Sequence, residues 1–72
     1  MSKAEKEQYL IASRIRILRE KEGWTIDELA ERLNIKPTYL RQMERAHKPM
    51  SINMAKLYRS IFNVTLDYIY FG

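Results

Sequence analysis

The chain has 72 residues, of which 46% are hydrophobic and 31% charged, and its net charge is +4. This length allows one domain with a small core, and the composition is that of a folded protein rather than a disordered one. The sequence has no cysteine, which excludes disulfides and thiolate metal sites.

No nucleophile and base set, phosphate loop or metal-ligand spacing occurs in the sequence, so we expect no enzyme activity and no cofactor. His47 has no acidic cluster near it and is interpreted as a solvated loop residue or a backbone contact. The absence of cysteine, of a signal-peptide pattern and of any long apolar run predicts a cytoplasmic protein without a membrane segment. The positive charge favours a polyanionic partner.

The sequence lacks sustained alternation of apolar and polar residues and has no Asn-Gly or Asp-Gly turn, which predicts an all-α fold. Residues 1–8 are polar and form either a tail or an extension of the first helix, and residues 9–72 form the domain. The first helix is predicted over residues 9–21 and ends at Gly23. Its inward stripe consists of Ile11, Ile15 and Leu18. Ile17 lies outside this stripe and is either an exposed side chain or a contact to another segment or subunit.

Three local signals predict a second helix that starts after Thr25. Thr25 and Glu28 form a T-x-x-E capping box, and Trp24 and Leu29 have the spacing of a hydrophobic staple. The inward stripe of this helix consists of Ile26, Leu29, Ala30 and Leu33.

A sharp turn is predicted to join this helix to a third. Asn34 accepts a left-handed backbone, and Pro37 favours the first position of the next helix, with Lys36 before it at the cap. Lys36 is a poor cap, so either water or a phosphate would satisfy the amides of Thr38 and Tyr39. The inward residues here are Ile35, Leu40 and Met43.

Two further helices are predicted after a loop that follows Ala46. Ser51 caps a fourth helix that ends near Phe62, and Thr65 caps a short fifth helix. The inward face of the fourth helix uses Met54, either Leu57 or Tyr58, and Ile61. The fifth helix is apolar nearly all round, so part of it closes the core and the rest predicts a two-fold homodimer. The predicted interface consists of Tyr68, Ile69, Tyr70 and Phe71.

The second and third helices have the spacing of a helix-turn-helix unit that reads the major groove of double-stranded DNA. The third helix presents Lys36, Thr38, Arg41, Gln42 and Arg45 away from the core. Gln, Arg and Lys make bidentate hydrogen bonds to base edges, and further cations neutralise phosphates. A plain solvated face is the alternative interpretation of Arg41 and Gln42.

Residues 9–72 resemble the phage repressor and Cro-type helix-turn-helix family. The matching positions are Leu29, Ala30, Leu33, Asn34, Ile35, Leu40 and Met43, followed by Glu44, Arg45 and the stretches SINMAKL and VTLDYIYFG. The resemblance implies a five-helix, lambda-repressor-like DNA-binding domain in which the second and third helices form the helix-turn-helix. It also implies a transcriptional regulator, with repression favoured over activation.

The resemblance assigns base contacts to Lys36, Pro37, Thr38, Arg41 and Gln42. It assigns DNA backbone contacts to Arg19, Thr25, Tyr39, Arg45 and Lys48. Tyr39 is alternatively part-buried against the fourth helix. The resemblance also pairs Arg19 with Glu44, as either an exposed or a buried ion pair.

Several positions depart from the family pattern. Ile26 replaces a Gln that supports backbone binding, and Pro37 offers only apolar contact to a base. Asn34 and Ala46 replace glycines, and Ala46 predicts an altered exit from the third helix. Ile26, Ala46 and the apolar C-terminus support an alternative function, a protein-interaction module such as an antitoxin or adaptor.

Overall fold

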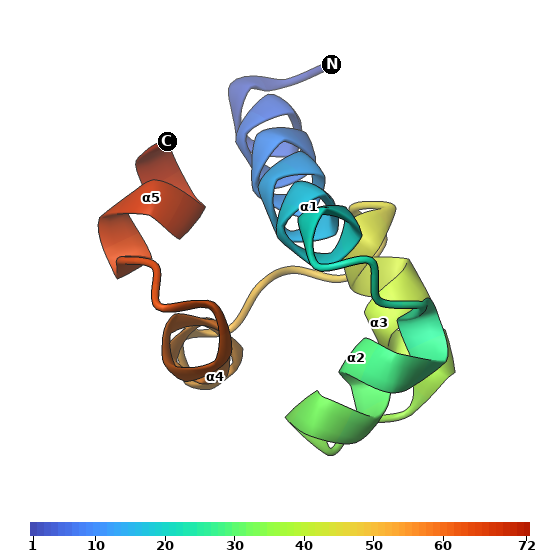
Figure 1. The fold of residues 1–72 in the computed structure, drawn as a ribbon. Helices are drawn as coiled ribbons and strands as arrows, with labels where there is room; N and C mark the ends of the chain where they lie inside the picture. Colours follow the sequence, from blue (N-terminus) through green and yellow to red (C-terminus); the bar gives the residue numbers. More distant parts are fainter.

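The computed structural model describes residues 1–72, and its regular structure is entirely helical. The helices are α1 (Lys3–Lys21), α2 (Ile26–Leu33), α3 (Pro37–Glu44), α4 (Ile52–Phe62) and α5 (Leu66–Phe71). The predicted all-α fold with five helices is confirmed. In Figure 1, α2 and α3 lie on one side of α1, and α4 and α5 lie on the other. α1 contacts α3 and α5, while α2 also touches α4. None of the helices is long and apolar enough to cross a membrane.

α1 begins six residues before the predicted start at residue 9, because a capping box stabilises its first turn. The Ser2 hydroxyl accepts a hydrogen bond from the Glu5 amide at 3.2 Å, and the Glu5 carboxylate accepts one from the Ser2 amide at 3.4 Å. Residues 3–8 therefore extend the first helix, which was one of the two predicted states of this segment.

The predicted start of α2 is confirmed. The Thr25 hydroxyl accepts from the Glu28 amide at 3.1 Å, and the Glu28 carboxylate accepts from the Thr25 amide at 3.0 Å. The hydrogen bond from the Thr25 amide to the Glu28 carboxylate is the largest cause of a lowered Glu28 pKa, and the Thr25 side chain lowers that pKa further. α2 ends at Leu33 and is capped by Asn34, whose φ of 57° is the left-handed conformation expected there.

The core lies between all five helices. Its largest fully buried side chains are Ile15, Leu29, Leu40, Met43, Tyr58 and Ile69. Tyr58 rather than Leu57 faces inward on α4, because Leu57 is 41% exposed. Ile69 corrects one expectation: it lies wholly inside the monomer, so it contributes no surface to a dimer interface.

The exit from α3 corrects another expectation. Ala46 has a φ of 62°, the left-handed conformation that a glycine adopts without strain. The chain therefore leaves α3 with the backbone geometry of a glycine, although the Ala46 side chain disfavours that conformation. The Gln8 side-chain amide donates to the Ala46 carbonyl at 2.7 Å, and the His47 amide donates to the Gln42 carbonyl at 2.8 Å. These bonds hold the exit in place, and the first of them comes from the helical extension of α1.

Candidate nucleic-acid interface

α3 is strongly two-sided. Leu40 and Met43 are buried against the core, whereas Thr38, Arg41 and Arg45 are exposed on the opposite side, with Gln42 half-buried beside them. At the start of the helix, Lys36 is exposed and makes no side-chain cap, and Pro37 occupies the first turn. The structure therefore places Thr38, Arg41 and Gln42 on the outer side of one short helix, with Lys36 and Pro37 at its N-terminal end.

The turn between α2 and α3 fixes the angle at which this face is presented. The Ile35 amide donates to the Ala30 carbonyl at 3.0 Å, and the Asn34 amide donates to the Glu31 carbonyl at 3.1 Å. These bonds close the C-terminal end of α2, a region that otherwise leaves carbonyls without partners. α3 begins after three intervening residues, and it packs against α2.

An ion pair joins the last turn of α3 to α1. The Arg19 Nε donates to Glu44 Oε2 at 2.8 Å and its Nη2 donates to Glu44 Oε1 at 2.9 Å. The Glu44 side chain is only 5% exposed and that of Arg19 only 15%. The hydrogen bond to Glu44 raises the pKa of Arg19. Of the two predicted alternatives, an exposed or a buried ion pair, the structure shows the buried one.

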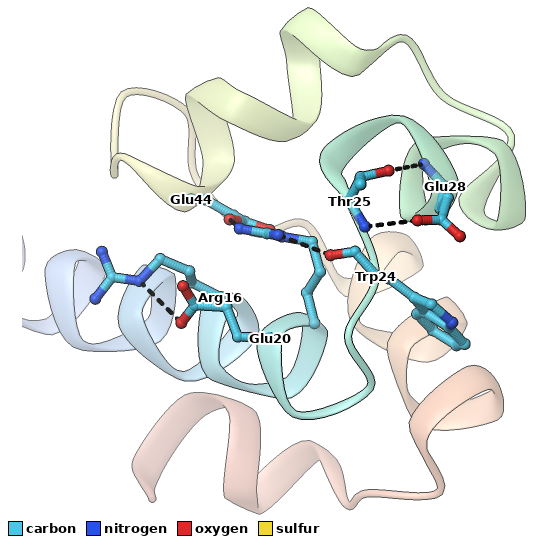
Figure 2. A network of polar contacts seen from close by, with 7 residues as sticks. Arg16, Glu20, Trp24, Thr25, Glu28 and Glu44 are labelled. Carbon is cyan, nitrogen blue, oxygen red and sulfur yellow. Dashed lines mark hydrogen bonds and ion pairs between the residues drawn. The ribbon is translucent and has the colours of Figure 1, made fainter.

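The same guanidinium also reaches the start of α2. Arg19 Nη1 donates to the Trp24 carbonyl at 2.9 Å, one residue before the α2 cap, and Figure 2 shows this carbonyl turned towards Glu44. One side chain therefore connects α1, α2 and α3. Each of its three nitrogens donates to a protein oxygen, which makes Arg19 part of the framework of the interface and leaves two of its five N–H groups for the predicted contact to the DNA backbone.

The other predicted backbone-contacting residues lie around the ends of α2 and α3. Thr25 is exposed at the start of α2, and its hydroxyl accepts the capping bond from Glu28. Tyr39 is half-buried and packs against the core cluster, which leaves part of its ring at the surface. Arg45 and Lys48 are exposed at and after the end of α3.

A surface hollow lies beside this face, and sequence reasoning did not identify it. Its volume is about 230 Å³, and its lining residues are Arg16, Arg19, Ile26, Arg41, Glu44 and Arg45. Arg16 is the member that was missed. The sequence places it on α1 outside the apolar stripe, but only the packing of α1 against α3 brings it next to Arg41 and Arg45.

The predicted dimer residues occupy α5 at the other side of the molecule. Phe71 is 80% exposed, while Tyr68 and Tyr70 are half-buried. The Tyr70 hydroxyl donates to the Met50 carbonyl at 3.2 Å, and Arg14 Nη1 donates to the Ile69 carbonyl at 3.1 Å. α5 is thereby fixed to the monomer with Phe71 pointing out.

Comparison with known proteins gives one match. A family model described as helix-turn-helix matches residues 15–69. No curated protein and no solved structure matches the chain.

Proposed function

The chain belongs to the helix-turn-helix family of the Cro type, and from this membership we propose that it is a sequence-specific regulator of transcription that inserts α3 into the major groove of double-stranded DNA. The observation that carries the proposal is the outward face of α3. It gathers amide, hydroxyl and guanidinium groups on a helix whose opposite side is held by the core and by the Arg19 and Glu44 pair.

The residues of this face have distinct proposed roles. Lys36, Thr38, Arg41 and Gln42 provide the hydrogen-bonding groups that distinguish base edges, and Pro37 provides an apolar contact. Thr25, Tyr39, Arg45 and Lys48 contact phosphates on either side of the groove, which position the helix without reading sequence.

We further propose that the protein binds as a two-fold dimer and represses transcription. The exposed Phe71 with the half-exposed Tyr68 and Tyr70 supports an interface on α5, and Ile17 of α1 is also 40% exposed. Two protomers related in this way would place their α3 helices about 34–36 Å apart and bind a palindromic site. Sedimentation at micromolar concentration, with and without DNA, tests the dimer; a monomer under both conditions contradicts it.

The test of the DNA-binding function is selection from a library of random DNA duplexes. The proposal predicts enrichment of one palindromic motif. If the dimer neutralises about 6–10 phosphates, a plot of log affinity against log salt concentration has a slope of about −5 to −9. No enrichment together with a flat salt dependence contradicts the proposal and favours a module that binds another protein.

A further inference from the structure

The arginine-lined hollow beside α3 carries an excess of positive charge. Four arginines and one glutamate line it, and the charge of Glu44 is already matched by Arg19 at 2.8 Å. Of the three remaining arginines, Arg16 belongs to α1, Arg41 belongs to α3, and Arg45 is the C-cap of α3. Three guanidinium groups therefore face one small space without a matching set of carboxylates.

The neighbouring acidic groups do not neutralise this cluster. Arg41 and Arg45 form no salt bridge, and Arg16 has only Glu20, at 3.9 Å. In Figure 2, Arg16 and Glu20 lie along α1 on the side nearest Glu44. Their side chains are 50% and 58% exposed, and a pair of this kind is weak because water screens it. The hollow thus keeps an excess of positive charge, and these like charges repel one another.

We propose that this hollow is a phosphate site, and that its occupant is a single phosphate of the DNA backbone held chiefly by Arg16 and Arg45. The inference rests on the proposed DNA-binding function and adds α1 to the binding surface. A guanidinium matches the oxygen geometry of a phosphate and donates two parallel hydrogen bonds to it. A volume of about 230 Å³ accommodates a phosphate group with its remaining water.

The place of the hollow fits a backbone contact. Arg41 and Arg45 are four residues apart, so they share a side of the helix region that also presents Thr38 and Gln42. With α3 in the major groove, as proposed, a DNA strand that borders the groove would pass next to that side. The buried bridge from Arg19 to Glu44 forms the floor of the hollow and leaves Arg16 and Arg45 at its rim.

The first experiment compares Arg16→Gln with a control of equal charge, Arg59→Gln. Arg59 is exposed on α4 and does not line the hollow. Affinity for a mixed-sequence duplex is measured as a function of salt concentration, and thermal unfolding of each variant checks that it is folded. Arg16→Gln should reduce the magnitude of the slope of log affinity against log salt by about 0.9 for each bound protomer. A fourfold rise in salt concentration would then lower the affinity by a factor about 3.5-fold smaller than for the unmodified protein. Arg59→Gln should change the slope far less.

The second experiment identifies the phosphate. Single phosphates of the duplex enriched by selection are replaced one at a time by uncharged methylphosphonates, and binding is measured with the unmodified protein and with Arg16→Gln. One position should weaken binding of the unmodified protein clearly more than binding of the variant, because Arg16 makes part of the contact that the methylphosphonate removes and Arg45 keeps the rest. A parallel titration of the protein with inorganic phosphate at constant ionic strength should show that free phosphate binds in the hollow much more weakly than the duplex does.

The outcomes separate this inference from the function on which it rests. Equal slopes for Arg16→Gln and Arg59→Gln, or losses that add at every phosphate position, overturn the site and leave sequence-specific DNA binding intact. If inorganic phosphate saturates the hollow while the methylphosphonate and Arg16→Gln losses add at every DNA position, the hollow binds a free anion. That result also overturns the proposal. A flat salt slope for the unmodified protein overturns both.

Discussion

The ion pair between Arg19 and Glu44 is the contact whose loss should have the largest consequence for this small domain. Replacing Glu44 by Leu leaves the Arg19 guanidinium in a site where its side chain is only 15% exposed. It loses two of its three hydrogen bonds to protein. Removing one partner of such a buried pair costs about 3–5 kcal/mol, since the remaining charge keeps its desolvation cost without compensation.

That cost is a large share of the total. A domain of this length has a free energy of unfolding of about 4–11 kcal/mol. Glu44→Leu should therefore shift the urea midpoint strongly or leave the chain partly unfolded, and Arg19→Met should do the same. The double variant should be far more stable than the sum of the two losses predicts, because apolar side chains of similar volume replace a buried pair at little cost.

Urea unfolding followed by circular dichroism measures all four proteins, with the slope of each transition compared to verify a common mechanism. Losses below about 1 kcal/mol for both single variants would show that the pair behaves as an exposed one. A double variant that is as unstable as the added losses would also refute the reasoning, since it would mean that the two residues act independently.

Three other changes have predicted effects on the free energy of unfolding. Ala46→Gly should stabilise the protein by about 1 kcal/mol, because glycine adopts the left-handed backbone at this position without strain. The same change at the exposed helical Ala4 is the control and should destabilise the protein. Equal effects at both positions would show that Ala46 is not strained. Thr25→Ala should cost about 0.5–2 kcal/mol. Separately from this cap, Thr25 holds the pKa of Glu28 below its ordinary 4.5, so the stability that the Glu28 carboxylate contributes is present above pH 4.5 and is lost as the pH falls through the folded-state pKa. The main cause is the Thr25 backbone amide, which remains in Thr25→Ala, so unfolding at a series of acid pH values should find most of this pH dependence retained in the variant. The Tyr58 hydroxyl is buried without a hydrogen-bond partner in the protein, and the same burial raises the pKa of Tyr58. Tyr58→Phe should therefore stabilise the protein by about 1 kcal/mol or more. A loss of stability would show that the hydroxyl has a hydrogen-bond partner.

The boundaries set by local chemistry were predictable from the sequence. Thr25 with Glu28 fixed the start of α2, and Asn34 with Pro37 fixed the turn, because each signal acts through bonds within a few residues. The start of α1 was equally local: Ser2 and Glu5 form the same type of capping box, but the polar residues that follow it lack an apolar stripe.

Features that depend on packing between distant segments were not predictable. α5 is apolar nearly all round, so only its contact with α1 and α4 determines that Ile69 turns inward and Phe71 outward. The bond from Gln8 to Ala46 spans 38 residues and has no local sequence signal. Arg16 likewise becomes a candidate for function only when α1 packs against α3.

The central claim is that the outward face of α3 reads DNA bases, and selection from a random duplex library with Gln42→Ala beside the unmodified protein tests it most directly. Loss of a bidentate base contact should cost about 1–3 kcal/mol and relax the preference at one position of each half-site, with the rest of the motif retained. Arg45→Ala, as the matched control on the same helix side, should weaken binding to all sequences alike. An unchanged motif with Gln42→Ala, or the same uniform loss for both variants, would contradict the account.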